Sequence, residues 1–136
     1  MKKLLTICLL IATACTATAQ QLSSGIYTVS ISKLTYSDVP GMFGNNFPGK
    51  QIKGIFTIKK GGVQTASQEF TYLQLFETSA TLHLNFDETS SNALTYDFDT
   101  KKFEIEDYEY KAKKTKTKED LILSGVLVYA QWLDEE

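Results

Sequence analysis

Residues 52–67 read IKGIFTIKKGGVQTAS, and this stretch predicts a β-hairpin. In its first half, Ile52, Phe56 and Ile58 lie on one face of an extended chain, while lysine and threonine side chains lie on the other. Such alternation is typical of a half-buried strand. Gly61 and Gly62 can adopt the positive φ angles that a tight reversal needs. We therefore expect two antiparallel strands that meet at these glycines.

The same alternation extends through most of the chain, whereas the spacing of a helical stripe is scarce. Residues 69–76 carry apolar groups on both faces, so we expect a strand covered on two sides there, with a helix as the alternative. Residues 121–133 are rich in Leu, Val and Tyr and predict a long last strand, with Gly125 as a bend or bulge. The other expected strands are residues 26–34, 81–86, 94–98, 103–105 and 111–118.

Short connections join these seven or eight expected strands. Short links favour pairing between neighbours in the sequence. We therefore expect an all-β fold in which an antiparallel up-and-down meander closes into a barrel. A two-sheet β-sandwich would produce the same alternation and stays open as the alternative.

The first 19 residues have the features of a secretory signal peptide. A start with two lysines is followed by an apolar run and by small residues before Gln20, as signal peptidase requires. The sequence of this leader resembles that of bacterial signal peptides. We expect a signal peptide over residues 1–19 and a single β-barrel-like domain over residues 20–136, secreted or periplasmic.

Both cysteines of the chain, Cys8 and Cys15, lie in this leader, so we expect no disulfide in the mature domain. The residues before Cys15 resemble a bacterial lipoprotein processing site, at which the cysteine is lipid-modified and begins the mature chain. A lipoprotein is thus one alternative to cleavage before Gln20, and an uncleaved leader that acts as an anchor is another. No later segment is long and apolar enough to predict a transmembrane helix.

The charge balance argues against nucleic acid as a partner. The chain of 136 residues carries 14 basic and 16 acidic groups, a net charge of −2, and loss of Lys2 and Lys3 with the leader makes it −4. Such a chain lacks the positive field that attracts phosphate backbones. All its basic residues are lysines, so the forked guanidinium that binds phosphate in a bidentate way is missing.

The sequence offers little catalytic chemistry, so we expect a protein that is not an enzyme and needs no cofactor. His83 is the only histidine, and it shares a strand face with Thr81 and Asn85. A histidine zinc site needs several imidazoles or thiolates. Glycine-rich phosphate loops and nucleophile elbows have no counterpart in the sequence. Its acidic residues fall in turns or beside lysines, not in the apolar surroundings that activate a catalytic carboxyl group.

Gly25, Ile26 and Tyr27 open the first expected strand, which is followed by a long loop and then by the rest of the meander. This plan resembles the lipocalin and calycin family of β-barrels, in which a Gly-x-Trp motif begins the first strand and a long loop covers one mouth of the barrel. Tyr27 stands where that motif has tryptophan, and the arginine that packs on the tryptophan has no counterpart here. The resemblance implies a barrel that binds a ligand.

The longest irregular segment, residues 36–49, contains both prolines and three bulky apolar residues, Met42, Phe43 and Phe47. An exposed loop does not hold such groups in water without a use for them. We interpret the loop as a lid over a cavity or as a contact surface for a partner. The alternative is a loop that folds its aromatic residues over one end of the core.

Two acidic residues are expected to face each other in the hairpin that follows Leu94. If Phe98 pairs with Phe103, Asp97 lies opposite Glu104, and facing carboxylates repel unless a cation lies nearby. A calcium site is one interpretation, and neutralisation by the lysines of the next strand is the other. Taken alone, the same lysines would suit an anionic surface.

Two functions fit these features. The first is an exported, non-catalytic protein of the bacterial envelope that holds a small apolar or aromatic ligand in a β-barrel. Aromatic residues make up 12% of the chain, and the residues that we expect around the ligand are Met42, Phe43, Phe47, Tyr27, Tyr72, Tyr96 and Trp132. The second is a module with a solid core that contacts another protein, as an inhibitor, an immunity protein or an assembly accessory does.

Overall fold

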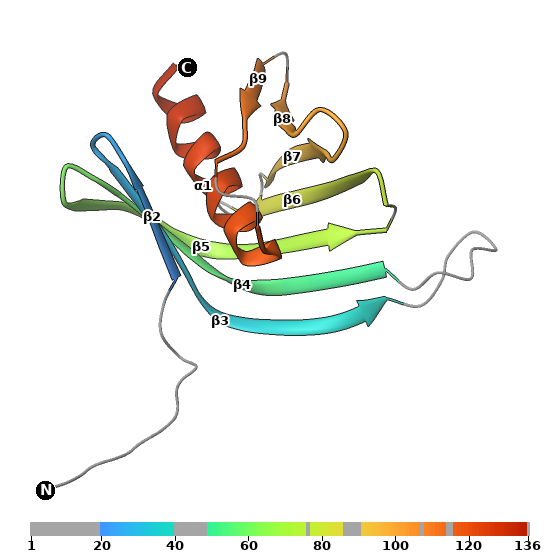
Figure 1. The fold of residues 1–136 in the computed structure, drawn as a ribbon. Helices are drawn as coiled ribbons and strands as arrows, with labels where there is room; N and C mark the ends of the chain where they lie inside the picture. The colour runs from blue at the N-terminus through green and yellow to red at the C-terminus, as the bar shows by residue number, and fades with distance from the viewer. Residues whose placement is uncertain are drawn as a thin grey trace, which may run out of the picture.

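A computed structural model describes residues 20–39, 49–75, 77–85, 91–106, 108–113 and 116–135. The leader with Cys15 and the loop residues Met42, Phe43 and Phe47 lie outside the described residues. The described chain forms eight strands and one helix (Figure 1). They are β2 (Gln20–Ser24), β3 (Tyr27–Val39), β4 (Gly49–Lys60), β5 (Val63–Gln74), β6 (Ser79–Asn85), β7 (Ser91–Asp97), β8 (Lys102–Ile105), β9 (Tyr108–Lys111) and α1 (Lys118–Glu135).

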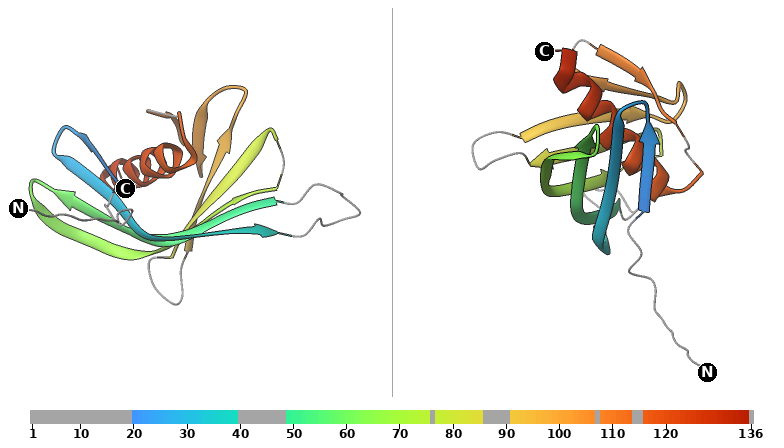
Figure 2. Two further views of the ribbon diagram at one scale, coloured as in Figure 1. Left: turned by 60° about the horizontal axis from the view of Figure 1, so that its bottom comes forward. Right: turned by 90° about the vertical axis from the view of Figure 1, so that its left-hand side faces the viewer.

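The eight strands form one antiparallel sheet, in which each strand pairs with its neighbour in the sequence, from β2 to β9. The predicted meander is thus confirmed, and the sandwich alternative is wrong because the described strands belong to a single sheet. The sheet curls into a half-barrel with α1 in its concave side (Figures 1 and 2). The predicted barrel is present as an open half-barrel: among the described strands, β2 and β9 end the strand order and do not pair with each other.

The hairpin of β4 and β5 confirms the prediction from residues 52–67. Lys60 pairs with Val63, and between them Gly61 and Gly62 have φ angles of 60° and 84°. Two positive φ angles at the centre of a two-residue turn match the right-handed twist of the flanking strands. The buried face of β4 carries Ile52, Phe56 and Ile58, as the alternation predicted.

The strands β3 and β4 bend at a bulge, and this bend curls the sheet. The β3–β4 pairing shifts register between Ser32 and Thr35, and Lys33 has a positive φ of 55° there. Opposite this bulge, a Cβ on Gly54 would lie 2.8 Å from the carbonyl oxygen of Ser32, so only glycine fits without a shift of the backbone. A bulge increases the local twist and re-aims the strand beyond it. The two halves of β3 and β4 therefore cover different sides of α1.

The start of the sheet differs from the prediction. Gly25 and Ile26 do not open the first strand, because they form the turn between β2 and β3. The strand that follows runs to Val39, so it takes up the first residues of the expected loop of residues 36–49. β2 contains one buried apolar residue, Leu22, so its sequence has no alternation that predicts a strand.

The last element is a helix, so the predicted strand of residues 121–133 is wrong. Thr117 caps the helix, since its Oγ1 accepts a hydrogen bond of 3.0 Å from the amide of Asp120. The ten residues 121–130 are all buried. A helix buried on every side shows no apolar stripe, so its sequence resembles a buried strand. Its length of 18 residues is typical of a helix and not of a strand.

Gly125 lets α1 lie close to the sheet and does not mark the bend or bulge that was predicted. A Cβ at this position would lie 2.5 Å from Cδ2 of Leu82 and 3.1 Å from the ring of Phe103. The neighbouring helix residues Ile122, Val126 and Tyr129 have no exposed surface, and Tyr129 meets Phe56 edge to face with ring centroids 6.3 Å apart. The side chains of α1 therefore occupy the concave side of the half-barrel.

Candidate functional site

The start of α1 is flanked by two open pockets at one rim of the half-barrel. One has a volume of about 260 Å³ and is called the rim pocket here. It lies between the helix, β5, β7 and the turn after β7. Its lining consists of Tyr72, Tyr96, Phe98, Lys101, Lys116, Thr117, Lys118 and Leu121.

Aromatic rings form much of the rim pocket. Tyr96 packs against Phe98 and against Phe103, with ring centroids 4.9 Å apart in both pairs. Tyr72 and Tyr96 are 2% and 3% exposed, so they form the deep part of the pocket, whereas Phe98 is half-buried at its edge. The Tyr72 hydroxyl donates a hydrogen bond of 3.1 Å to Oε1 of Gln74. Burial, with a smaller effect of Tyr96, raises the pKa of Tyr72 to about 12, so its phenol stays neutral.

Asp97 holds the turn that carries Phe98 and Lys101. Its Oδ1 accepts hydrogen bonds of 2.8 and 3.2 Å from the amides of Asp99 and Thr100, an arrangement that fixes a turn locally. Its carbonyl accepts a further bond of 2.8 Å from the amide of Lys101. The amide of Phe98 in turn donates to the carbonyl of residue 78 at 3.0 Å, so both pocket residues of the turn are anchored.

This turn corrects the predicted register of the acidic hairpin. Asp97 pairs with Lys102, and Glu104 pairs with Thr95, so the two carboxylates are not opposed. The predicted pairing of Phe98 with Phe103 is wrong because Tyr96 takes the position opposite Phe103. The reason is the capping of the turn by Asp97, which moves the reversal one residue toward β7. The facing charges that suggested a calcium ion are therefore absent from this hairpin.

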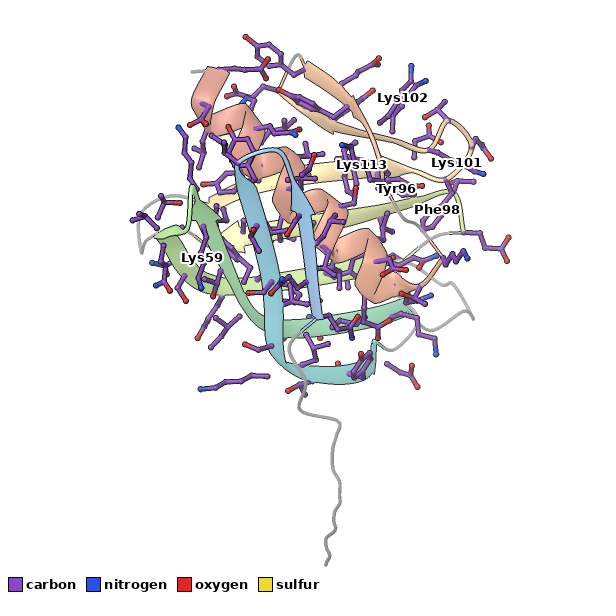
Figure 3. The ribbon with its side chains drawn as sticks, turned by 60° about the vertical axis from the view of Figure 1, so that its left-hand side comes forward. Lys59, Tyr96, Phe98, Lys101, Lys102 and Lys113 are labelled. Carbon is purple, nitrogen blue, oxygen red and sulfur yellow. The ribbon has the colours of Figure 1, made fainter. Side chains whose placement is uncertain are left out.

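Lysines surround the opening of the rim pocket. The predicted strand of residues 111–118 is wrong: β9 ends at Lys111, and the chain then leads into the helix. Lys116 and Lys118 consequently line the pocket opposite Lys101 and do not form a ladder with the acids of β8. Of the residues that line the pocket, none is acidic. Figure 3 shows Tyr96, Phe98 and Lys101 together on one side of the molecule.

The second pocket has a volume of about 340 Å³ and shares Lys118 with the rim pocket. It lies where β3 ends and β4 begins. Lys50 and Asp38 form an ion pair of 2.8 Å at its edge. Its lining is Tyr36, Ser37, Asp38, Lys50, Gln51, Ile52 and Lys118, a more polar set than that of the rim pocket.

Three tyrosine hydroxyls fasten α1 to the sheet. At the start of the helix, Tyr36 donates to Glu119. At its end, Tyr27 donates to Asp134 and Tyr110 to Glu135, and Lys60 lies 2.9 Å from the Asp134 carboxylate. The hydrogen bond from Tyr27, followed by that from Lys60, lowers the pKa of Asp134. The same bond with Asp134 raises the pKa of Tyr27.

We expect the free energy of unfolding to fall between about pH 10 and 12. Desolvation, together with the bonds to Glu119 and Glu135, raises the pKa values of Tyr36 and Tyr110 from 10.0 to about 12. A group with a raised pKa stabilises the fold below its unfolded value, and this contribution disappears as the pH approaches the folded value. Urea unfolding at pH 9 and pH 11 measures the effect.

The variants Tyr36→Phe and Tyr110→Phe control for this loss of stability. Each lacks one titrating phenol, so we expect each to lose less stability from pH 9 to pH 11 than the unaltered protein. Equal unfolding free energies at both pH values in the unaltered protein would contradict the raised tyrosine pKa values.

The residues expected around a ligand are divided between the two ends of α1. Tyr72 and Tyr96 lie together in the rim pocket. Trp132 is eleven residues from Leu121, about 16 Å along a helix, and Tyr27 contacts Asp134 near the same end. Trp132 stacks on Tyr129 with ring centroids 6.0 Å apart, and its buried Nε1 has no hydrogen-bond partner among the described residues. The structure therefore does not bring these four residues into one site.

Six residues of the rim pocket were not predicted from the sequence. Their positions are set by α1 and by the turn after β7. These residues are Phe98, Lys101, Lys116, Thr117, Lys118 and Leu121. The signal that was available is Thr117 followed three residues later by Asp120, a pattern close to a capping box before an apolar run. A helix start at this point would have placed the lysines before it at the mouth of the half-barrel.

Within the part of the chain that the structure describes, no three His, Cys, Asp or Glu side chains lie close enough to hold a metal ion. In the described part of the chain, no helix is long and apolar enough to span a membrane.

Comparison with known proteins found no match: none of the protein-family models, curated proteins and solved structures compared with the chain is similar to it.

Proposed function

We propose that this chain is an exported, non-catalytic binding protein that holds a small apolar or aromatic molecule in the rim pocket. The resemblance to lipocalins implies that a curled sheet holds a ligand. The proposal keeps that idea but moves the ligand from the interior to the rim, because α1 occupies the interior.

The observation that carries the proposal is the aromatic floor of the rim pocket. Ligand sites are concave, mostly apolar and supplied with a few polar groups that orient the ligand. Tyr72, Tyr96, Phe98 and Leu121 provide apolar surface here, and the phenol groups and lysines provide polar ones. Pockets for drug-sized molecules measure about 300–1,000 Å³. A volume of about 260 Å³ therefore indicates a ligand of one or two rings.

The remaining parts of the proposal come from the sequence. Export is supported by the basic, apolar and small-residue regions of residues 1–19. The absence of catalysis is supported by the single histidine and by the lack of cysteine after the leader. We propose no cofactor.

We expect Phe98→Ser to weaken the binding of a hydrophobic fluorescent probe about two- to tenfold, since an aromatic contact contributes about 0.5–1.5 kcal/mol. Phe98 lies at the edge of the pocket, and its ring meets Tyr96 at 4.9 Å. A fluorescence titration of residues 20–136 with the neutral probe phenylnaphthylamine measures the dissociation constant.

Ile26→Ser is the matched control for this titration. Ile26 is an exposed apolar residue of the β2–β3 turn, and it does not line the rim pocket. Ile26→Ser should leave the dissociation constant unchanged. The proposal fails if the probe shows no saturable binding, or if Phe98→Ser and Ile26→Ser have equal effects.

The second candidate function is contact with another protein, which the filled interior and one exposed apolar surface favour. The turns β2–β3 and β4–β5 are joined by a hydrogen bond of 2.8 Å from the amide of Gly61 to the carbonyl of Ile26. At this joined tip, Ile26 is 55% and Val63 66% exposed. Absence of probe binding, combined with recovery of one stoichiometric partner that requires these two side chains, would favour this function.

A further inference from the structure

We propose that the ligand of the rim pocket is an aromatic or apolar anion, such as a carboxylate, sulfonate or phosphate ester. This inference rests on the proposed function and specifies the class of its ligand. It follows from the combination of a deep aromatic floor with a rim that carries only positive charge.

The charged side chains of the pocket lining are all positive. Lys101, Lys116 and Lys118 all line the rim pocket, and its lining contains no acidic residue. None of the three lysine side chains forms an ion pair or hydrogen bond with another residue in the described ranges. By contrast, Lys50, Lys60 and Lys102, which lie elsewhere on the surface, each have a carboxylate within 4.0 Å. Among the described residues, Lys33, Lys53, Lys59 and Lys111 also have no ion pair, but only Lys101, Lys116 and Lys118 line the rim pocket.

This charge comes from two separate segments of the chain, the turn after β7 and the start of α1. Lys101 belongs to the turn that Asp97 holds, with a positive φ of 60°. Its carbonyl accepts a bond of 3.2 Å from the amide of Ala112, which ties the turn to the segment leading into α1. Lys116 precedes the helix, and Lys118 is its first residue. These segments converge on one opening, so an anion there would meet lysines from both sides.

The N-terminus of α1 lies beside the rim pocket but is already capped. Helix amides attract anions at an N-terminus, but Thr117 already caps this one and Glu119 and Asp120 follow in the first turn. Glu119 is turned toward Tyr36, on the side of the other pocket. The lysine side chains, and not the helix, are therefore the groups that we expect to bind the anion. Lysine binds an anion as a point charge, so carboxylates, sulfonates and phosphates all suit it.

The test compares two fluorescent probes that differ by one charge. Anilinonaphthalene sulfonate is an anion, and phenylnaphthylamine has the same ring system without the sulfonate. We expect the unaltered domain of residues 20–136 to bind the sulfonate about tenfold more tightly, since three exposed cations each contribute modestly. Raising the salt concentration should reduce this preference, because surface charges are screened.

The decisive variant is Lys101→Gln with Lys116→Gln and Lys118→Gln. We expect it to bind the sulfonate about tenfold more weakly and the neutral probe as before, so that the preference disappears. Unchanged binding of the neutral probe also shows that the variant is folded. The matched control is Lys33→Gln with Lys53→Gln and Lys59→Gln, which removes the same charge from exposed lysines outside the pocket.

This control is matched in two further ways. Lys33, like Lys101, has a positive φ, so each triple variant changes one strained position. Lys59 lies on the opposite side of the molecule from Lys101 in Figure 3. The control should keep the preference for the sulfonate.

The outcomes separate the inference from the function on which it rests. If both probes bind equally well and Phe98→Ser weakens both, the binding function stands and the anionic ligand class is wrong. If both triple variants reduce sulfonate binding equally, the effect is one of net charge, and the inference is again overturned. If neither probe shows saturable binding that depends on Phe98, the function and the inference fail together.

Discussion

Val126→Asp should unfold the protein. Val126 lies in the middle of α1 with no exposed surface, between Ile122 and Tyr129, which are equally buried. An unpaired carboxylate at such a site costs about 3–5 kcal/mol, which is comparable to the whole stability of many small domains. Far-ultraviolet circular dichroism and urea unfolding measure the loss.

Leu133→Asp is the control for this substitution. Leu133 lies in the same helix but is 36% exposed, so the new carboxylate stays in water. We expect a loss of about 1 kcal/mol or less, mainly from negative charge near the helix C-terminus. Similar losses from both substitutions would mean that α1 does not lie inside the half-barrel.

Gly125→Leu should cost about 3 kcal/mol or more, because it inserts a side chain where no space exists. Even a Cβ at this position would lie 2.5 Å from Leu82 Cδ2. Close-packed interiors relax only slightly around an added group, so the helix would have to move away from the sheet. Urea unfolding monitored by tryptophan fluorescence measures the cost, since Trp132 lies in the same helix.

A double-mutant cycle separates this steric effect from helix propensity. In the unaltered protein, Gly125→Ala gains about 1 kcal/mol of helix propensity but loses about 1–3 kcal/mol to the clash. In a Leu82→Ala background the clashing methyl group is gone, so the same change should become stabilising. An equal effect of Gly125→Ala in both backgrounds would show that Gly125 and Leu82 are not in contact.

The sheet was predictable because each of its signals is local. Alternation at Ile52, Phe56 and Ile58 identifies a buried face whatever the rest of the fold, and two adjacent glycines after a strand require a reversal. Short connections then make neighbours in the sequence neighbours in the sheet. The register of the hairpin after β7 was not predictable in this way, because the side chain of Asp97 decides where the turn begins.

The helix was missed because its environment, and not its sequence pattern, determines its form. Every residue from 121 to 130 is buried, since the sheet curls around the helix. A stripe of apolar residues arises only when one side of a helix faces water. In a run of Leu, Val and Tyr, the sequence pattern of a buried strand cannot be distinguished from that of a fully buried helix. Only the cap at Thr117 and the length of the run indicated a helix.

The candidate site was only partly predictable for the same reason. Tyr72 and Tyr96 were identified because they are aromatic residues on the buried faces of strands. The positions of Phe98 and Lys101 depend on the register of the turn after β7. The positions of Lys116 and Lys118 depend on where α1 begins. A wrong prediction of the turn or of the helix therefore misplaces these residues. The loop residues Met42, Phe43 and Phe47 lie outside the described residues, and their role as a lid over a cavity or as a contact surface stays a prediction.

Mapping of the bound anilinonaphthalene sulfonate by amide chemical shifts tests the whole account most directly. The isotope-labelled domain of residues 20–136 is titrated with the probe, and the amide signals are followed to saturation. We predict changes concentrated in residues 96–101 and 116–121, where the turn after β7 meets the start of α1. Saturable changes at the tip formed by Ile26 and Val63, with none beside the helix start, would contradict it.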